Sequence, residues 1–370
     1  MLTVRRSMTW KLVGVAPALL LCLAGCARSS NVRVQPVTQV QTRDAGEMTM
    51  ERLRGERLPT LESVEPWENT YGPGLKLSTA HYEVFTTVLE PLMLRTVPGF
   101  LESAYRGYND QLSKPIETIT RFKVYLFATR RQWEDFTRSF AGEQASVFRK
   151  IKTGAYCLNG ACVAYDIGGA RTLTALGHEG WHQFNSQHFK YRLPSWLDEG
   201  VAMQFETSRY EQGVYHFDPA VNMQRLGALR ETLDKTSRIP LRDLIAMSPG
   251  EVLATNQADA VMAFYGQSYA LVRFLREAGF GRYYSCYHRM LLDALSGQWP
   301  LDESTGNVAQ DRNLPRTLDW NRRVGLQVFE HYIGSNIEQL EQEYLAYCRR
   351  IVRNISVVWH NNDAYVAIDR

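Results

Sequence analysis

Two histidines four residues apart and two glutamates lie in the stretch GHEGWHQFNSQHFKYRLPSWLDEGVA, residues 177–202, which also holds a third histidine, His188. His178, Glu179 and His182 form the pattern H-E-x-x-H, and residues four apart share one face of an α-helix. Both imidazoles can then bind one metal ion, because a neutral imidazole nitrogen is a good Zn²⁺ ligand. Glu179 is expected to project beside the ion, where a carboxylate can take a proton from a metal-bound water.

A tetrahedral site with two histidines lacks a third protein ligand, and a catalytic site keeps the fourth position for water. Glu199 lies 16 residues after His182, near the start of the next expected helix. A loop stopped by Pro194 lies between them, so the chain can fold back and bring Glu199 to the histidines. His188 is the alternative third ligand, but it lies on another face of its helix, which favours a surface or capping role.

The helix that carries Glu199 is expected to begin just after Pro194. Ser195 is its expected N-cap, and Asp198 at the third position gives a variant of the capping box. Asp198 is also a candidate hydrogen-bond partner of a zinc-bound histidine, because such histidines usually donate their second ring N–H to a carboxylate or a carbonyl group. The two roles of Asp198 remain alternatives.

The run HEGWH followed by LPSWLDEGVAMQFE resembles the gluzincin metallopeptidases, which take two histidines from one helix and a glutamate from the next. The part L-P-x-W-L-x-E-G-x-A is particularly similar to the peptidase-MA-like domain family, many of whose members are bacterial lipoproteins. The resemblance is specific over residues 177–206. It implies a zincin-like fold with the site in a cleft between two lobes, one Zn²⁺ per chain bound by His178, His182 and Glu199, and Glu179 as general base.

A second segment, Phe264–Val272, reads FYGQSYALV and resembles the Y-x-K-G-x-x-L-L helix of gluzincin aminopeptidases. The resemblance implies that the hydroxyl group of Tyr265 stabilises the oxyanion of the tetrahedral intermediate. Gln267 and Ser268 depart from the lysine and glycine of that pattern. Tyr269, one helical turn later, is an alternative donor, and a core position for both tyrosines is the other alternative.

The G-x-M-E-N strand, whose glutamate binds the free amine of the substrate in those aminopeptidases, has no counterpart here. The matching residues 164–170 read AYDIGGA, with Asp166 but without a glutamate. This favours cleavage within a peptide over removal of its first residue. The strand could still bind an extended peptide by edge pairing.

The elements that must position these residues follow two patterns. Residues 78–170 alternate strands and helices in the order β-α-β-α-β-β, which predicts an α/β lobe over one small mixed sheet. Residues 171–370 have helical spacing throughout, which predicts a C-terminal helical lobe and an α+β fold overall. Besides the two helices of the H-E-x-x-H stretch, helices are expected near 222–233, 260–278, 280–296 and 336–353.

Residues 1–25 have the pattern of a secretory signal, with a basic start and an apolar run too short to span a membrane. The sequence LAGC at 23–26 resembles the lipobox of bacterial lipoproteins, which implies a lipid anchor at Cys26; a plain cleaved signal is the alternative. Ala27, where an aspartate is absent, favours the outer membrane, facing the periplasm. Residues 26–77 are polar with little periodicity and are expected to be a membrane tether and irregular lead-in.

Four cysteines follow the lipobox. Cys157 and Cys162 flank Leu-Asn-Gly-Ala, and Asn-Gly is a strong signal for a two-residue hairpin turn. The two cysteines are then directly opposed, with Cα atoms about 4.5 Å apart, which predicts a disulfide near the short end of the allowed geometry. Cys286 and Cys348 lie in helical patterns, where a bridge and buried thiols are equally compatible with the sequence.

Composition fits a globular protein, and charge gives no sign of a nucleic-acid partner. Of the 370 residues, 45% are hydrophobic and 22% charged, which is ordinary for a globular protein. The formal net charge of +3 falls to zero without the three basic residues of the signal, and no run of lysine or arginine predicts a nucleic-acid partner.

The sequence therefore predicts a zinc endopeptidase of the bacterial cell envelope, with a protein or peptide substrate and a lipid anchor in the membrane. A zinc hydrolase of a non-peptide or cell-wall amide or ester, a catalytically silent scaffold, and a helix pair without metal remain alternatives.

Overall fold

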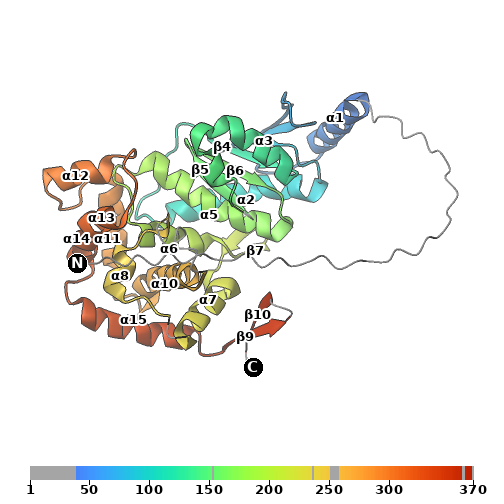
Figure 1. The fold of residues 1–370 in the computed structure, drawn as a ribbon. Helices are drawn as coiled ribbons and strands as arrows, with labels where there is room; N and C mark the ends of the chain where they lie inside the picture. Colours follow the sequence, from blue (N-terminus) through green and yellow to red (C-terminus); the bar gives the residue numbers. More distant parts are fainter. Residues whose placement is uncertain (1–38, 152–153, 236, 251–257, 361–362, 369–370) are drawn as a thin grey trace, which may run out of the picture. The chain divides into compact units, whose positions relative to one another are not determined.

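A computed structural model of the chain describes residues 39–151, 154–235, 237–250, 258–360 and 363–368 (Figure 1). The predicted signal sequence and the predicted lipidation site, Cys26, lie outside these residues. Among the helices that the structure describes, none has both the length and the hydropathy needed to cross a membrane.

Six strands form one mixed sheet: β1 (Ser63–Pro66), β2 (Leu75–Ser78), β3 (Tyr82–Thr86), β4 (Phe122–Phe127), β5 (Ala155–Leu158) and β6 (Ala161–Tyr165). Their order in space is β1-β2-β3-β4-β6-β5, with β3, β4 and β6 parallel and the other neighbours antiparallel. The helices α2 (Pro91–Asn109) and α3 (Arg130–Phe140) follow β3 and β4. The predicted β-α-β-α-β-β order and the mixed sheet are therefore confirmed, as is an α+β fold.

Helices cover both faces of this sheet. Alternate residues of a strand point to opposite faces, and Val124 and Cys162 pack into a core with α2 and α5 (Gly169–His188). Phe127 and Val163, one or three positions along the same strands, pack into a second core with Trp133 of α3. The helix that carries the H-E-x-x-H pattern thus lies directly on the sheet, against β5 and β6.

The sheet begins earlier in the chain than the sequence predicts. Helix α1 (Gln39–Gly55), strand β1 and the start of strand β2 fall within residues 26–77, so the predicted irregular lead-in is wrong from residue 39 onward. Strands of four residues show too little alternation to be recognised. The structure identifies β2 as a strand by its antiparallel pairing with β3, in which the buried Leu77 lies opposite the buried Val84.

The four helices predicted in the second half are confirmed as α7 (Met223–Asp234), α10 (Ala258–Glu277), α11 (Tyr284–Ser296) and α15 (Ile337–Ile351). Shorter helices join them: α6 (Ser195–Ala202), α8 (Leu241–Ala246), α12 (Glu303–Gln310), α13 (Leu318–Trp320) and α14 (Leu326–Tyr332). Figure 1 shows α6, α8 and α10 as neighbouring elements below α5.

The prediction that residues 171–370 contain only helices is wrong. A hairpin of β7 (Ser208–Glu211) and β8 (Val214–Phe217) follows α6, with Gln212 at a φ of 50° in its turn. A second hairpin, β9 (Ile355–His360) and β10 (Asp363–Ile368), lies at the C-terminal end of the described chain. β7 and β8 have four residues each, too few to be recognised among helical patterns.

The hairpin of β5 and β6 has the predicted register. Asn159 and Gly160 both have positive φ, at 51° and 73°, and Cys157 lies directly opposite Cys162. In the structure both cysteines are free thiols, as are Cys286 and Cys348, so the predicted disulfide is not formed here. Burial raises the pKa of the Cys157 and Cys162 thiols well above its usual value, which disfavours the thiolate that forms a disulfide.

Candidate metal centre

Helix α5 is positioned by its first turn and by two glycines. Asp166 accepts hydrogen bonds from the Gly168 amide and the Thr172 hydroxyl, both at 2.9 Å, and so holds the start of the helix. A Cβ atom at Gly177 would lie 2.3 Å from the carbonyl oxygen of Phe205, and one at Gly180 would lie 2.3 Å from the hydroxyl of a tyrosine on α2. Close packing on this face leaves the opposite face, with the two histidines, directed at α6.

Asp166 is thus occupied by the helix and is not a free carboxylate for a substrate amine. The expectation of edge pairing along this strand is also wrong, because β6 lies between β4 and β5 and is paired with both. β5 is the outer strand on this side of the sheet.

Helix α6 begins directly after Pro194, which takes the N-cap position predicted for Ser195. The glycine that follows Glu199 allows α6 to lie against α10, since a Cβ atom at Gly200 would be 2.6 Å from the carbonyl oxygen of Ser268. This close approach fixes the side chain of Glu199 in front of α5. The Glu-Gly pair of the sequence therefore has a packing reason.

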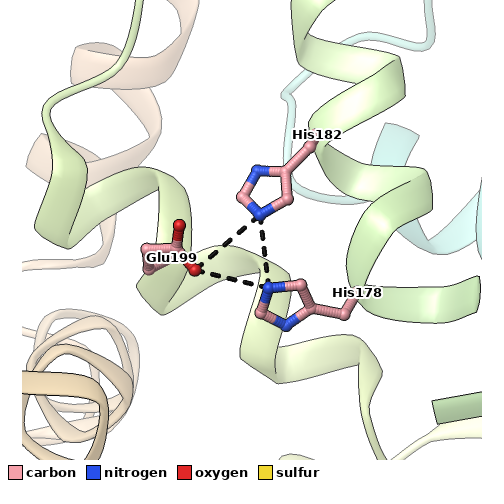
Figure 2. A group of neighbouring side chains, drawn as sticks. All are labelled: His178, His182 and Glu199. Atoms are coloured by element: carbon pink, nitrogen blue, oxygen red, sulfur yellow. Dashed lines mark hydrogen bonds and ion pairs between the residues drawn. The ribbon is translucent and has the colours of Figure 1, made fainter. Parts of the chain in front are cut away.

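His178, His182 and Glu199 converge on one point (Figure 2). The Nε2 atoms of the two histidines are 3.2 Å apart, and Oε2 of Glu199 lies 3.3 Å from Nε2 of His178 and 3.8 Å from Nε2 of His182. In a tetrahedral zinc site with ligand bonds of about 2.0–2.2 Å, neighbouring ligand atoms are ~3.3–3.5 Å apart. The three side chains are 11–16% exposed, so the group is shielded but reachable.

Each imidazole is held from behind by a carboxylate. Nδ1 of His182 lies 2.9 Å from Oδ1 of Asp198, and Nδ1 of His178 lies 3.0 Å from Oε1 of Glu206. A carboxylate at Nδ1 favours the tautomer that carries its proton there. Both Nε2 lone pairs and the Glu199 carboxylate then point at the same small volume.

Two arginines stabilise these outer carboxylates. Arg316 donates to Oδ2 of Asp198 at 2.5 Å, and Arg225 donates through Nε and Nη2 to both oxygens of Glu206 at 2.8 and 2.5 Å. Burial would raise the pKa of Glu206, but the Arg225 guanidinium outweighs it and lowers the pKa to about 2. The pKa of Asp198 is likewise held below its usual value by His182 and Arg316 against the effect of burial.

The predicted contact of Asp198 with a histidine of the pair is present, and its alternative role as a helix cap is not. Glu206 was not recognised from the sequence, because it lies 28 residues after His178 and no spacing rule connects the two. Its place, shortly after the second helix of the motif, is the one signal that the sequence offers.

Without a cation, protons can take the central place in this cluster. Burial lowers the pKa of His178, but hydrogen bonds with Glu199 and Glu206 outweigh it and raise the pKa to about 9. The pKa of His182 is also raised, by Asp198 and Glu199 against burial, and the pKa of Glu199 is lowered by the histidines. The cluster therefore favours positive charge at its centre, as a cation site does.

Replacing Glu206 with glutamine should weaken both the fold and the metal site. Arg225 is only 18% exposed and would lose its buried anion, so the free energy of unfolding should fall by about 3–5 kcal/mol. Zinc affinity should fall about 10–100-fold, as for other outer partners. Thermal unfolding and chelator competition measure the two effects. Glu231→Gln, which removes a carboxylate paired with the half-exposed Lys235, is the control, and equal losses in both variants would contradict the assignment.

The carboxylate of Glu179 is not engaged by a neighbouring side chain of the described residues, which leaves it available to act as a base. Among the described residues its carboxylate has no hydrogen-bond partner, in contrast to the other acidic residues of the centre. Burial raises the pKa of Glu179, against the lowering effect of the two histidines. The side chain is partly buried and stands on α5 beside His178.

The structure distinguishes Tyr265 from Tyr269. The charge of Glu199, followed by burial, raises the pKa of Tyr265 above its usual value, and the guanidinium carbon of Arg225 lies 5.3 Å from the centre of its ring. Tyr269 is fully buried, donates its hydroxyl hydrogen to the carbonyl oxygen of Pro219 and accepts from Arg273 at 3.1 Å. Tyr265 therefore lies near the metal centre, and Tyr269 is a core residue.

Two other expectations concern the surroundings of the site. Nε2 of His188 lies 2.9 Å from the Thr118 hydroxyl, and its ring packs on Phe184, so His188 is not a third ligand. Gln267 stands where the pattern that this segment resembles has lysine. Its side chain accepts from the Ile239 amide and donates to the Ile239 carbonyl oxygen, both at 2.8 Å, and so stabilises the fold.

A cavity of about 840 Å³ lies between α2 and β8 and is not lined by the three ligands. A cleft between two lobes at the metal centre stays a prediction.

Comparisons with known proteins add one similarity. Residues 172–300 match a family model described as a protein of unknown function (DUF1570). No curated protein and no solved structure matches the chain. The matched segment begins in α5 and ends after α11. This chain is thus similar to that family over a segment that contains both histidines, Glu179, Glu199 and Tyr265.

Proposed function

We propose that this chain is a zinc-dependent endopeptidase of the gluzincin type. The observation that carries the proposal is the convergence of His178, His182 and Glu199, with each imidazole held by a carboxylate at Nδ1. Three acceptor atoms that face one another at 3.2–3.8 Å repel unless a cation or a proton lies among them.

The donor set fits Zn²⁺. Two imidazole nitrogens and one carboxylate oxygen form a known catalytic zinc set, which leaves a fourth position for water. When bound, Zn²⁺ supplies Lewis acidity, which polarises a carbonyl group and makes water acidic near neutral pH. Binding of one ion per chain is expected, because the described residues contain one group of this geometry.

Four residues of the chain have three separate roles in peptide hydrolysis. Glu179, with its unpaired carboxylate, takes the proton of the attacking water and passes it to the leaving amine. Tyr265 donates a hydrogen bond to the oxyanion that develops on the carbonyl group, and its raised pKa keeps the phenol protonated. Asp198 and Glu206 orient the histidines.

Cleavage inside a peptide chain is the reaction that we propose. The chain lacks the glutamate that binds a free amine in the related aminopeptidases, and Asp166 in the corresponding segment is bonded to the start of α5. A lipid at Cys26 would place this activity at a bacterial membrane, in our proposal the outer membrane on its periplasmic side.

Replacing Tyr265 with phenylalanine should lower kcat about 100- to 1,000-fold, because an oxyanion donor is lost. Bound zinc should remain stoichiometric, since Tyr265 is not a ligand. Steady-state kinetics and metal analysis test this together. Tyr269→Phe is the matched control, because it removes a core hydroxyl group that contacts Pro219 and Arg273. A larger loss of kcat in the control than in Tyr265→Phe would assign the donor to Tyr269.

The proposed activity is tested with residues 27–370 loaded with zinc and offered an unfolded protein such as casein. New amino ends at internal positions, absent after chelation, would support an endopeptidase. Release of products from cell-wall fragments without any peptide cleavage would show a non-peptide hydrolase. Zinc binding without turnover of either substrate would indicate a scaffold.

A further inference from the structure

Three arginines join two loops beside the metal centre. Arg192 lies between α5 and α6, and Arg312 and Arg316 lie between α12 and α13. Each guanidinium group donates to main-chain oxygen atoms of the opposite loop. The acceptors are the carbonyl oxygens of Asp311 and Leu314 for Arg192, of Phe189 for Arg312 and of Leu193 for Arg316.

These bonds use only part of each guanidinium group. Arg192 and Arg316 donate only through Nη1, so that Nε and Nη2 of both side chains have no acceptor among the described residues. The Nε–Nη2 edge is one of the two-donor edges of arginine that match the two oxygens of a carboxylate. The Trp320 ring centre lies 5.7 Å from the Arg192 guanidinium carbon. Two unused donor edges thus belong to side chains whose Nη1 atoms are held by hydrogen bonds.

The three arginines have few close acidic partners, and Asp311 acts on Arg192 only beyond ion-pair distance. Asp198 is the one carboxylate within ion-pair distance of the three arginines in the described chain, and it also accepts from His182 and Asn185. Burial and the charges of Arg316 and Arg312 lower the pKa of Arg192 to about 10. An additional anion would relieve this repulsion.

The cluster adjoins the metal centre and remains reachable. Arg316 contacts Asp198, which in turn bonds His182, and the charge of Glu199 also acts on Arg316. The side chain of Arg316 is 27% exposed, and Arg312 is exposed. Arg316 is thus separated from a proposed metal ligand by the single side chain of Asp198.

We propose that Arg192, Arg312 and Arg316 form a subsite that binds a carboxylate of the peptide substrate, so that the enzyme prefers peptides with negative charge near the cleaved bond. The carboxylate is either the free C-terminus or an acidic side chain. This inference rests on the proposed peptidase function. If the arginines serve only to join the two loops, the charge of the substrate has no influence on binding.

The test compares peptide pairs of one sequence. One pair differs in a free or an amidated C-terminus, and the other in an internal glutamate or glutamine. Binding is measured by calorimetry on the full-length, zinc-loaded chain in detergent, with Glu179→Gln to prevent turnover. The chain should bind an acidic member about tenfold or more tightly than its neutral partner, as for a charge-assisted hydrogen bond. The pair that shows the preference identifies the source of the carboxylate.

Arg192→Lys keeps the charge and removes the donor edge, and Arg312→Gln removes the charge. In both variants the ratio of the two affinities should fall towards one, whereas Arg138→Gln, an exposed arginine on α3, should leave it unchanged. An equal affinity for both members, or a ratio unaltered by these substitutions, overturns the subsite. Cleavage of neutral peptides without any charge preference overturns the subsite alone. A charge preference in binding without cleavage by the wild type overturns the peptidase alone, and absence of all peptide binding overturns both.

Discussion

Replacing Glu199 with alanine should remove zinc from a chain that remains folded. The wild type, as residues 27–370, should hold about one zinc per chain. In the variant two imidazoles remain, and their Nε2 atoms 3.2 Å apart lose the carboxylate that neutralises the ion and completes the set. Loss of a ligand should cost more than the 10–100-fold in affinity that loss of an outer partner typically costs. Metal analysis after dialysis, followed by chelator competition, measures the change.

The control for this variant is Glu231→Ala. Glu231 is a buried carboxylate on α7 that is paired with a lysine and does not belong to the ligand group. Thermal unfolding of both variants without metal shows whether either is unfolded. Stoichiometric zinc that survives in Glu199→Ala would show that Glu199 is not a ligand, and the gluzincin assignment would then fail. No zinc in either wild type or variant, even after reconstitution, would favour a scaffold.

The residues of the metal centre differ in how far the sequence could predict them. The prediction that His178 and His182 lie together follows from their spacing of four in one helix. This is a local rule that does not require knowledge of the tertiary structure. Glu199 depends on a helix–loop–helix, and it was predicted because Pro194 marks the second start and the motif resembles a known family. Glu206 depends on the η2 turn (Met203–Phe205) after α6, which no pattern predicts.

Contacts between residues far apart in the sequence could not be predicted for the same reason. Arg316 meets Asp198 across 118 positions of sequence, and the two are brought together by the packing of loops without periodicity. The strands β1, β2, β7 and β8 have four residues each, too few for alternation to outweigh the neighbouring helical pattern. The Cys157–Cys162 register was predictable because Asn-Gly determines the turn, while the redox state of the pair is not a matter of register.

The second large effect is expected for Glu179→Gln, which should abolish turnover and leave the metal in place. Glutamine has nearly the same shape but cannot accept the proton of the attacking water, so kcat should fall about 100- to 10,000-fold. The structure gives Glu179 no hydrogen-bond partner among the described residues, and its burial opposes the charged form. Neutral glutamine should therefore leave the thermal stability of the chain unchanged or slightly higher.

Loss of turnover with retention of zinc distinguishes the general base from the metal ligands. Glu199→Ala should lose zinc and activity together, whereas Glu179→Gln should lose activity alone, and Glu231→Gln neither. Full activity in Glu179→Gln would mean that another group takes the proton, and the surrounding carboxylates offer no substitute, because Asp198 and Glu206 each bind an arginine and a histidine. Zinc loss in Glu179→Gln would instead make Glu179 a ligand. That result is at odds with the geometry, in which the two Nε2 atoms and Oε2 of Glu199 already form a group that could hold the ion.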